Sequence, residues 1–277
     1  MTGTLCSSVT DRPRAGRHDS FAVLSGIFHQ LAKSPSFLVW EWITIHDTTR
    51  MIAELRQQQN LNSRQRWLSF FEFLVGATIV IAHNVYHRVP NEVPILFVLG
   101  WISIQLRDGG WKAVGLRKPD SWRKTILWGL LVGVLIIAAG QLADFVGSKI
   151  WHQAAKGPSL IKEAKTTWKA ALLVLGVVWT FAAFGEEMGY RGYLMTRAAD
   201  VGNRSKLAYL VALLASSVLF GYGHYYKGPP GILQSIVSGF ILGGAYLFSD
   251  RNLWVLIVAH GCADTIALAA VFFGLAD

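Results

Sequence analysis

Three groups of residues in the last third of the chain combine acids and bases at one common spacing. The groups are Glu186-Glu187-x-x-x-Arg191, Phe220-x-x-x-His224 and His260-x-x-x-Asp264. On a helix, residues four apart lie one turn apart on the same face, so each group presents its two ends together. Glu187 precedes Arg191 in the order that favours a helical ion pair, and this pairing would leave Glu186 free on a neighbouring face.

Each group alone has an ordinary structural explanation. A glutamate–arginine pair can be structural, a buried histidine can satisfy a hydrogen bond, and a histidine–aspartate pair can join two helices. All three groups, however, fall in long apolar runs. A charged side chain at the centre of a bilayer costs about 2.5–3.5 kcal/mol, and such residues usually face a polar interior and mark function. Glu72 and Asp144 count less, because they lie near the ends of apolar runs, where a side chain such as Glu72 can reach the interface.

The apolar runs that carry these residues are long enough to cross a bilayer, which takes about 20 residues. The chain contains seven apolar runs, at roughly residues 67–86, 91–106, 125–148, 168–199, 206–226, 232–248 and 253–274. Gly228-Pro229-Pro230-Gly231 is expected to end the fifth run. The runs are continuous rather than alternating, which indicates helices and excludes a β-barrel. We therefore predict an all-α fold, a polytopic transmembrane helical bundle of about seven spans.

Composition agrees with a membrane protein. Hydrophobic residues make up 52% of the chain and charged residues 16%, with a mean hydropathy of +0.37. Soluble domains carry about a quarter charged residues. The net charge of +9 fits lysine- and arginine-rich loops beside membrane helices. No nucleic-acid-binding motif is present, so we expect no nucleic-acid partner.

The sequence divides into three predicted regions. Residues 1–65 are expected to form a cytosolic or interfacial region with amphipathic helices. Residues 66–124 form a transmembrane hairpin and a basic loop, and residues 125–277 form the domain that carries the three groups. The 107–124 loop and the 149–169 stretch are both basic, so the positive-inside rule leaves the sidedness open.

Helix lengths predict that the three groups meet. With a turn near residues 200–206, Glu186 and His224 lie about 21 and 27 Å from that turn at about 1.5 Å per residue. By the same rise, His260 and Asp264 lie about 12 to 18 Å from a turn at residues 249–252. Helix tilt can close the remaining difference in depth. We expect the acids and histidines of three spans to surround one pocket.

The three groups, in this order on successive membrane helices, resemble the motifs of the CPBP family, also called the Abi or CAAX-protease-like family of intramembrane proteases. The family motifs are Glu-Glu-x-x-x-Arg, Phe-x-x-x-His and His-x-x-x-Asn or Asp. The resemblance covers roughly residues 125–277, most specifically 168–270. It implies a bundle similar to CAAX prenyl protease 2, with the site in a membrane cavity. The implied substrate is a peptide or protein in the membrane, such as a prenylated CAAX protein.

The resemblance also implies roles for the individual residues. Glu186 and His224 would activate a water that attacks a peptide carbonyl. His260 and Asp264 would stabilise the oxyanion, while Glu187, Arg191 and Phe220 would support the site. An ionised Asp264 would repel an oxyanion, so we interpret His260 as the donor and Asp264 as the group that holds the histidine's tautomer and charge.

Several alternatives stay open at this point. Zinc accepts the ligand types of Glu186, His224, His260 and Asp264, so a metallo-endopeptidase is one of them. The sequence contains no His-Glu-x-x-His, Gly-x-Gly-Asp or Gly-x-Ser-x-Gly pattern of other intramembrane protease classes. A non-proteolytic membrane immunity or scaffold protein fits the same resemblance. A proton-coupled transporter would use buried acids too, but the chain shows no matching pair of broken helices. We expect an integral membrane protein of a bacterial inner membrane.

Overall fold

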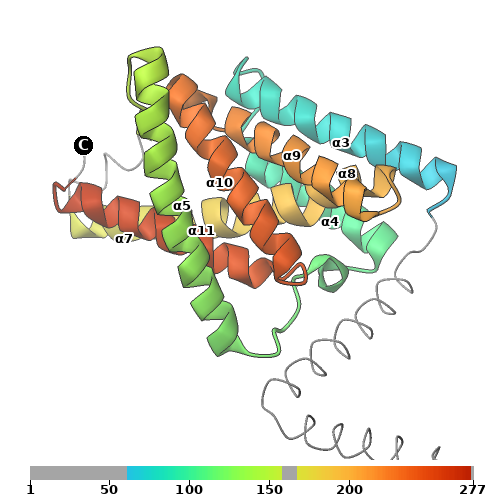
Figure 1. The fold of residues 1–277 in the computed structure, drawn as a ribbon. Coiled ribbons are helices and arrows are strands. Elements are labelled where there is room, and N and C mark those ends of the chain that lie inside the picture. Colours follow the sequence, from blue (N-terminus) through green and yellow to red (C-terminus); the bar gives the residue numbers. More distant parts are fainter. Residues whose placement is uncertain (1–60, 158–166, 276–277) are drawn as a thin grey trace, which may run out of the picture. The chain divides into compact units, whose positions relative to one another are not determined.

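The structure, a computed structural model, describes residues 61–157 and 167–275, and every regular element in these residues is helical. The elements are α3 (Ser63–Asn84), α4 (Glu92–Asp108), η1 (Trp111–Val114), α5 (Trp122–Trp151), α7 (Trp168–Val177), η2 (Val178–Leu194), α8 (Met195–Val201), α9 (Lys206–Tyr222), η3 (Tyr225–Lys227), α10 (Gly228–Phe248) and α11 (Leu253–Phe272) (Figure 1). The predicted all-α fold is confirmed. The amphipathic helices predicted before residue 61 lie outside the described residues.

Each of the seven apolar runs forms a helix, but the helices differ in length. Five segments are long and apolar enough to span a membrane: α3, α5, the continuous stretch from α7 to α8, the stretch from η3 through α10, and α11. Helices α4 and α9 have 17 residues each. At about 1.5 Å per residue they reach roughly 26 Å, a little less than the ~30 Å hydrocarbon core. The estimate of about seven spans is therefore approximate.

Side-chain caps fix where the helices begin. Asn62, Ser121, Thr167, Ser205 and Asn252 each precede a helix, and each accepts a hydrogen bond from a backbone N–H of its first turn. Such caps satisfy N–H groups that have no partner within the helix. The caps at Ser205 and Asn252 close the two turns expected near residues 200–206 and 249–252, which are confirmed.

The Gly-Pro-Pro-Gly segment behaves differently from the prediction. Helix α9 already ends at Tyr222, and residues 228–231 form the first turn of α10 instead of a break after the fifth run. Proline is tolerated in a first turn because the N–H it lacks would have no acceptor there. As a consequence His224 lies in a short turn between α9 and η3, with φ of −113° and ψ of 28°.

Glycines bring α4 against the stretch that carries the first motif. A Cβ on Gly185 would lie 2.7 Å from Cγ1 of Val93, and one on Gly189 would lie 3.2 Å from Cβ of Leu96. The contact moves forward from Val93 to Leu96 along α4 as it moves forward from Gly185 to Gly189 along η2, so the two helices run in the same direction. Small residues at such contacts let helix backbones approach closely in a membrane.

The geometry of η2 itself is unusual. Residues Val178–Leu194 are π-helical, and the helix closes with a hydrogen bond from Met195 N–H to the Tyr190 carbonyl five residues back. π-Helical turns are rare, occur mostly as single turns and are frequent at functional sites. The first motif lies entirely within this stretch.

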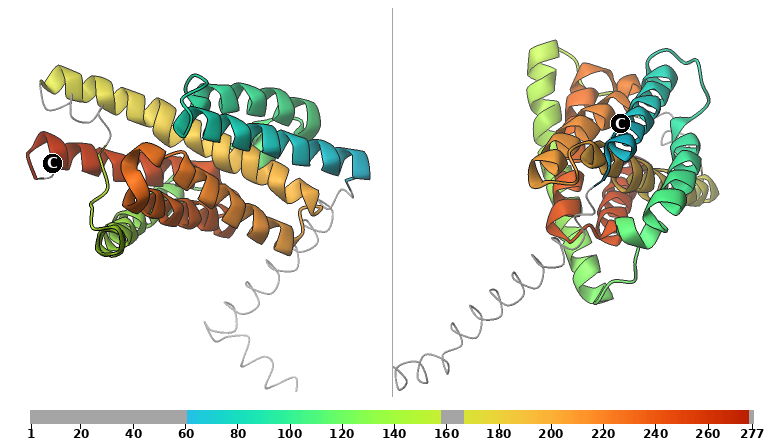
Figure 2. Two further views of the ribbon diagram at one scale, coloured as in Figure 1. Left: turned by 90° about the horizontal axis from the view of Figure 1, so that it is seen from above. Right: turned by 90° about the vertical axis from the view of Figure 1, so that its right-hand side faces the viewer.

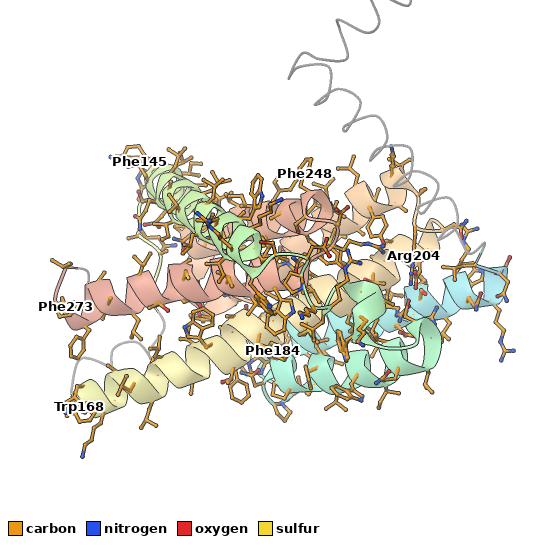
Figure 3. All side chains as sticks on the ribbon, turned by 90° about the horizontal axis from the view of Figure 1, so that it is seen from below. Phe145, Trp168, Phe184, Arg204, Phe248 and Phe273 are labelled. Carbon is orange, nitrogen blue, oxygen red and sulfur yellow. The ribbon has the colours of Figure 1, made fainter. Side chains whose placement is uncertain are left out.

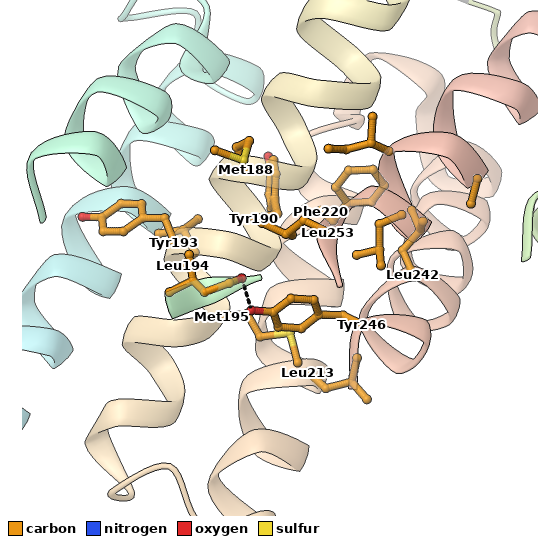
Figure 4. Close-up of a cluster of buried hydrophobic side chains, with 14 of the residues drawn as sticks. Met188, Tyr190, Tyr193, Leu194, Met195, Leu213, Phe220, Leu242, Tyr246 and Leu253 are labelled. Carbon is orange, nitrogen blue, oxygen red and sulfur yellow. Dashed lines mark hydrogen bonds between the residues drawn. The ribbon is translucent and has the colours of Figure 1, made fainter. Parts of the chain in front are cut away.

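The remaining packing arranges the helices around η2. Helix α5 packs on α10 and α11, α9 packs on α10, and α11 packs on η2. Figures 1 and 2 show α5 crossing α11 at a steep angle. Side chains of η2, α9, α10 and α11 meet in one apolar cluster (Figure 4), whose members include Tyr190, Leu213, Phe220, Leu242 and Leu253.

Large apolar side chains also point away from the protein. Phe145, Phe248 and Phe273 project outward in Figure 3, with 60%, 90% and 72% of their surface exposed. So much exposed apolar surface is unfavourable in water and favourable in lipid.

Three arginines and three acids form a buried network where α3, α4 and α8 meet, which we call the arginine–carboxylate cluster. Its members are Glu72, Arg107, Asp108, Arg197, Asp200 and Arg204. Nη1 of Arg107 lies 2.7 Å from Oε1 of Glu72, and Nη1 of Arg197 lies 2.6 Å from Oδ2 of Asp200. The sequence allowed Glu72 to reach the interface, but in the structure Arg107 from α4 pairs with its carboxylate inside the bundle.

The cluster perturbs the titration of Asp108. Burial alone would raise the pKa of Asp108, but the charges of Arg197 and Arg204 outweigh burial and hold this pKa below its usual value. The three acids and three arginines have no net charge when all are ionised. Their ion pairs connect α3, α4 and the region around the end of α8.

Candidate active site

Glu187 is the centre of the contacts between η2 and α11. Its Oε1 accepts hydrogen bonds from Nη1 of Arg191 at 3.0 Å and from Nδ1 of His260 at 2.8 Å. The side chains of Glu187 and Arg191 are 0% and 1% exposed. The helical ion pair expected from the sequence is therefore present, and it also binds a histidine from another helix.

Phe220 brings the second motif to the same place. Its ring lies 4.4 Å from Cζ of Arg191, and its centroid lies 4.7 Å from the ring of His224 and 6.1 Å from the ring of His260. Arg191 also donates from Nη2 to the carbonyl of Gly239 at 3.3 Å. Side chains of all three motifs thus surround one aromatic ring, as the helix lengths predicted.

The backbone sets the tautomer of His224. Nδ1 of His224 lies 2.9 Å from the carbonyl oxygen of Phe220. A carbonyl oxygen can only accept, so Nδ1 carries the hydrogen and Nε2 of the neutral ring keeps its lone pair. No residue within 61–157 or 167–275 makes a hydrogen bond to Nε2. His224 therefore offers a free base to the site.

Glu186 supplies an acid without a partner. Its Oε2 is buried and has no hydrogen-bond partner in the described part of the chain. Buried polar groups are nearly always hydrogen-bonded. Oε2 of Glu187 is also unpaired, but its Oε1 accepts two hydrogen bonds, whereas Glu186 makes none in the described residues. Glu186 interacts electrostatically with His260 and Asp264 of α11 and with Glu92 of α4. As expected, it is Glu187 that pairs with Arg191 while Glu186 stays outside that pair.

His260 lies between two carboxylates. Its Nδ1 contacts Glu187, and its Nε2 lies 3.5 Å from Oδ2 of Asp264, whose side chain is 35% exposed. The sequence interpretation gave Asp264 the task of holding His260. The contact with Glu187 is 0.7 Å shorter than the one with Asp264 (3.5 against 2.8 Å), so Glu187 orients the ring more strongly. A hydrogen bond weakens steeply with distance, and 3.5 Å is long for one.

The sequence interpretation missed Glu92 and its partners. Glu92 is 6% exposed, accepts a hydrogen bond from Nδ2 of Asn84 at 2.9 Å and lies 3.4 Å from Nε2 of His83. A glutamate at the start of a helix is favoured by the helix dipole, so nothing local marked it as unusual. Only the packing of α4 on η2 brings it into electrostatic contact with Glu186.

The short helix η3 adds a lysine and an aromatic ring. The ring of Tyr226 lies 6.0 Å from the ring of His224. Lys227 follows it and interacts electrostatically with Asp264 and Glu186. Neither residue belonged to a recognised spacing, although they come two and three residues after the second motif.

The donor arrangement does not present a metal-binding group. Among residues 61–157 and 167–275, no three His, Cys, Asp or Glu side chains are grouped so that they could hold a metal ion. Nε2 of His224 and Oε2 of Glu186 are free, but both nitrogens of His260 face carboxylates. The four candidate zinc ligands are therefore not grouped around one position that a metal could occupy.

Comparison with known proteins identifies the segment that carries these residues. Residues 167–276 match the family model described as type II CAAX prenyl endopeptidase Rce1-like. This segment belongs to the Rce1-like family. The match contains all three motifs and confirms the resemblance to the CPBP proteases, while α3, α4 and α5 lie outside it. No curated protein and no solved structure matches the chain significantly.

The Rce1-like segment and the long apolar helices together give a coarse assignment. The chain is an integral membrane protein with a domain of a protease family. The side chains of the three motifs converge within this Rce1-like domain, on η2, α11 and the end of α9, while Glu92 reaches the site from α4 outside it.

Proposed function

We propose that the chain is an intramembrane endopeptidase that hydrolyses a peptide bond in prenylated proteins of the CAAX type. The observation that carries the proposal is a free acid and a free base beside one rigid framework. The acid is the unpaired buried oxygen of Glu186, and the base is Nε2 of His224. Glu186 precedes Glu187 in the chain, and His224 packs on the Phe220 ring that contacts Arg191, so both lie next to the framework that Glu187 forms with Arg191 and His260.

In the proposed reaction, Glu186 and His224 activate one water. The carboxylate of Glu186 takes a proton from the water as its oxygen attacks the peptide carbonyl carbon, and the carbonyl oxygen becomes an oxyanion. The C–N bond then breaks, and the departing nitrogen receives a proton. An imidazole at His224 can pass this proton, because its Nε2 accepts and then donates while Nδ1 stays bonded to the backbone.

His260 is the proposed donor to the oxyanion. Glu187 fixes the ring through Nδ1, so the Nε2–H points toward the side of Asp264. The long contact to Asp264 leaves room for a substrate oxygen to compete for this N–H. A donor that is oriented before the reaction stabilises developing charge without reorganisation. Asp264 keeps the ring charged, while Arg191 and Phe220 position Glu187 and the two histidines.

Reconstitution in lipid vesicles tests the proposal. A fluorogenic peptide with a prenylated CAAX end should be cleaved by the wild type, while Glu186→Gln and His224→Asn should each lose at least about 100-fold in rate, as removal of a general acid or base does. The exposed residues Asp120 and His152 provide matched controls as Asp120→Asn and His152→Asn. Equal cleavage by wild type and both site variants would end the proposal.

Two further measurements separate the alternatives. Cleavage should persist in a chelator, and loss in chelator with recovery on added zinc would favour the metallo-endopeptidase. If the site variants keep a biological activity that needs no cleavage, the result supports the hypothesis of an immunity or scaffold protein. Membrane fractionation tests the expected location in a bacterial inner membrane.

A further inference from the structure

Lys227 is a cation at the site that the proposed reaction does not use. Its side chain is half-buried, and its Nζ lies 6.0 Å from the ring centroid of Tyr226. It interacts electrostatically with Asp264 and Glu186, and with His224 three residues before it. Within the described residues, Nζ makes no hydrogen bond and no ion pair.

The position of Lys227 is fixed by the backbone around it. Its N–H donates to the carbonyl of His224 at 2.9 Å, and its carbonyl accepts from the N–H of Lys156 at 3.0 Å. The aliphatic part of its side chain packs on Gly231, where a Cβ would lie 2.1 Å from Cβ of Lys227. The stem is thus held, while the half-buried charged end lies over the Tyr226 ring with no acidic group at ion-pair distance in the described residues. A partly buried ammonium group is stabilised when an anion pairs with it.

A CAAX substrate brings such an anion. In the C-terminal Cys-a-a-X sequence, the prenylated cysteine is followed by three residues that end in a free carboxylate. Three extended residues span roughly 10 Å. Lys227 follows His224 by three residues, which corresponds to about 6 Å between their Cα atoms at the rise of a 3₁₀-helix. The four-carbon side chain of the lysine extends this reach.

We propose that Lys227 binds the terminal carboxylate of the substrate and so selects peptides that end a few residues after the scissile bond. The inference rests on the proposed function, since it concerns the substrate of the same site. Lys227 is a specificity-determining residue in this role, because it contacts the substrate away from the reacting atoms. A lysine that only offset the charge of the acids would affect all substrates alike.

Two peptides with identical prenylated sequences test this, one ending in a carboxylate and the other in an amide. Wild type should cleave the acid more efficiently than the amide by about ten- to hundredfold in kcat/KM, the usual range for a hydrogen bond to a charged group. Lys227→Met should remove this preference, mainly by raising KM for the acid, and Lys227→Arg should retain much of it. Lys206→Met, at an exposed position, is the matched control.

The possible outcomes separate this inference from the proposed function. Equal cleavage of acid and amide by wild type, or an equal loss on both peptides in Lys227→Met, would overturn the role of Lys227 and leave the protease intact. If Lys227→Met does not fold, Lys227→Gln takes its place, and equal cleavage of acid and amide by the wild type still overturns the inference. If wild type cleaves neither peptide, the proposed function fails, and competition between acid and amide for binding to the wild type still tests the carboxylate contact.

Discussion

Replacing Arg191 by methionine tests whether the Glu187 framework is held by a buried charge pair. The two side chains are 1% and 0% exposed, and 3.0 Å separates Nη1 of Arg191 from Oε1 of Glu187. Removing one partner of such a pair costs about 3–5 kcal/mol, because the other charge stays buried. His260 still contacts Glu187 at 2.8 Å. We therefore expect Arg191→Met to lower the free energy of unfolding by about 3 kcal/mol, the lower end of that range.

A double variant makes the reasoning specific. Glu187→Gln keeps an oxygen that accepts from His260 but removes the charge, so Arg191→Met in the same chain leaves no orphaned carboxylate. The double variant should be more stable than the sum of the two single losses predicts, by about 1–2 kcal/mol, which is typical of residues in contact.

Unfolding in mixed micelles with increasing sodium dodecyl sulfate, followed by tryptophan fluorescence, measures these changes. Arg123→Met, at an exposed position on α5, controls for loss of an arginine as such. If the single losses add within about 0.5 kcal/mol, the two residues do not act as a pair and the reasoning is refuted.

Three other expectations follow from the same structure. Phe220→Leu should fold but cleave about ten- to hundredfold more slowly, because the ring that spaces Arg191 and His224 is lost; kcat on reconstituted enzyme measures this. Asp108 has a lowered pKa, so its contribution to stability is present above its usual pKa and is lost as the pH falls through the lowered value; unfolding curves of Asp108→Asn should depend less on acidic pH. Gly115→Ala should destabilise the protein by more than about 1–2 kcal/mol, because φ is +103° and the new Cβ would lie 1.5 Å from the Arg251 carbonyl oxygen; thermal unfolding should show it, and an unchanged melting temperature would contradict it.

Features that depend on neighbours in the sequence were predictable. The pair between Glu187 and Arg191 follows from spacing along one helix, and it is present. The turns near residues 203 and 250 follow from polar residues between apolar runs, and they are present. The family could likewise be recognised from the sequence, because each of its three motifs spans only five or six consecutive residues.

Features that depend on packing between distant segments were not predictable. Nothing near Glu187 indicates that His260, 73 residues later, would be its closest partner. Glu92 resembled an ordinary first-turn glutamate until α4 was placed on η2. Glu72 resembled an interfacial residue, but Arg107, 35 residues away, pairs with it. Sequence spacing gives the direction of a side chain on its own helix, and the partner depends on which helix packs there.

The same limit explains the Gly-Pro-Pro-Gly segment. Prolines and glycines break a helix in its interior, and the pattern was interpreted in that sense. They also suit the first turn of a helix, and the sequence alone does not separate these two positions. The structure starts α10 there, which leaves His224 in the preceding turn with its Nδ1 bonded to Phe220.

The π-helical stretch couples the length of the chain to the direction of its acids. A π-helical turn holds about one residue more than an α-helical turn, so each residue of η2 turns the chain by less than the ~100° of an α-helix. If η2 became a regular α-helix of the same length, Glu186 and Glu187 would rotate relative to α7 and no longer face α11. Engineering that restores α-helical turns in this segment must therefore also change its length to keep the acids in place.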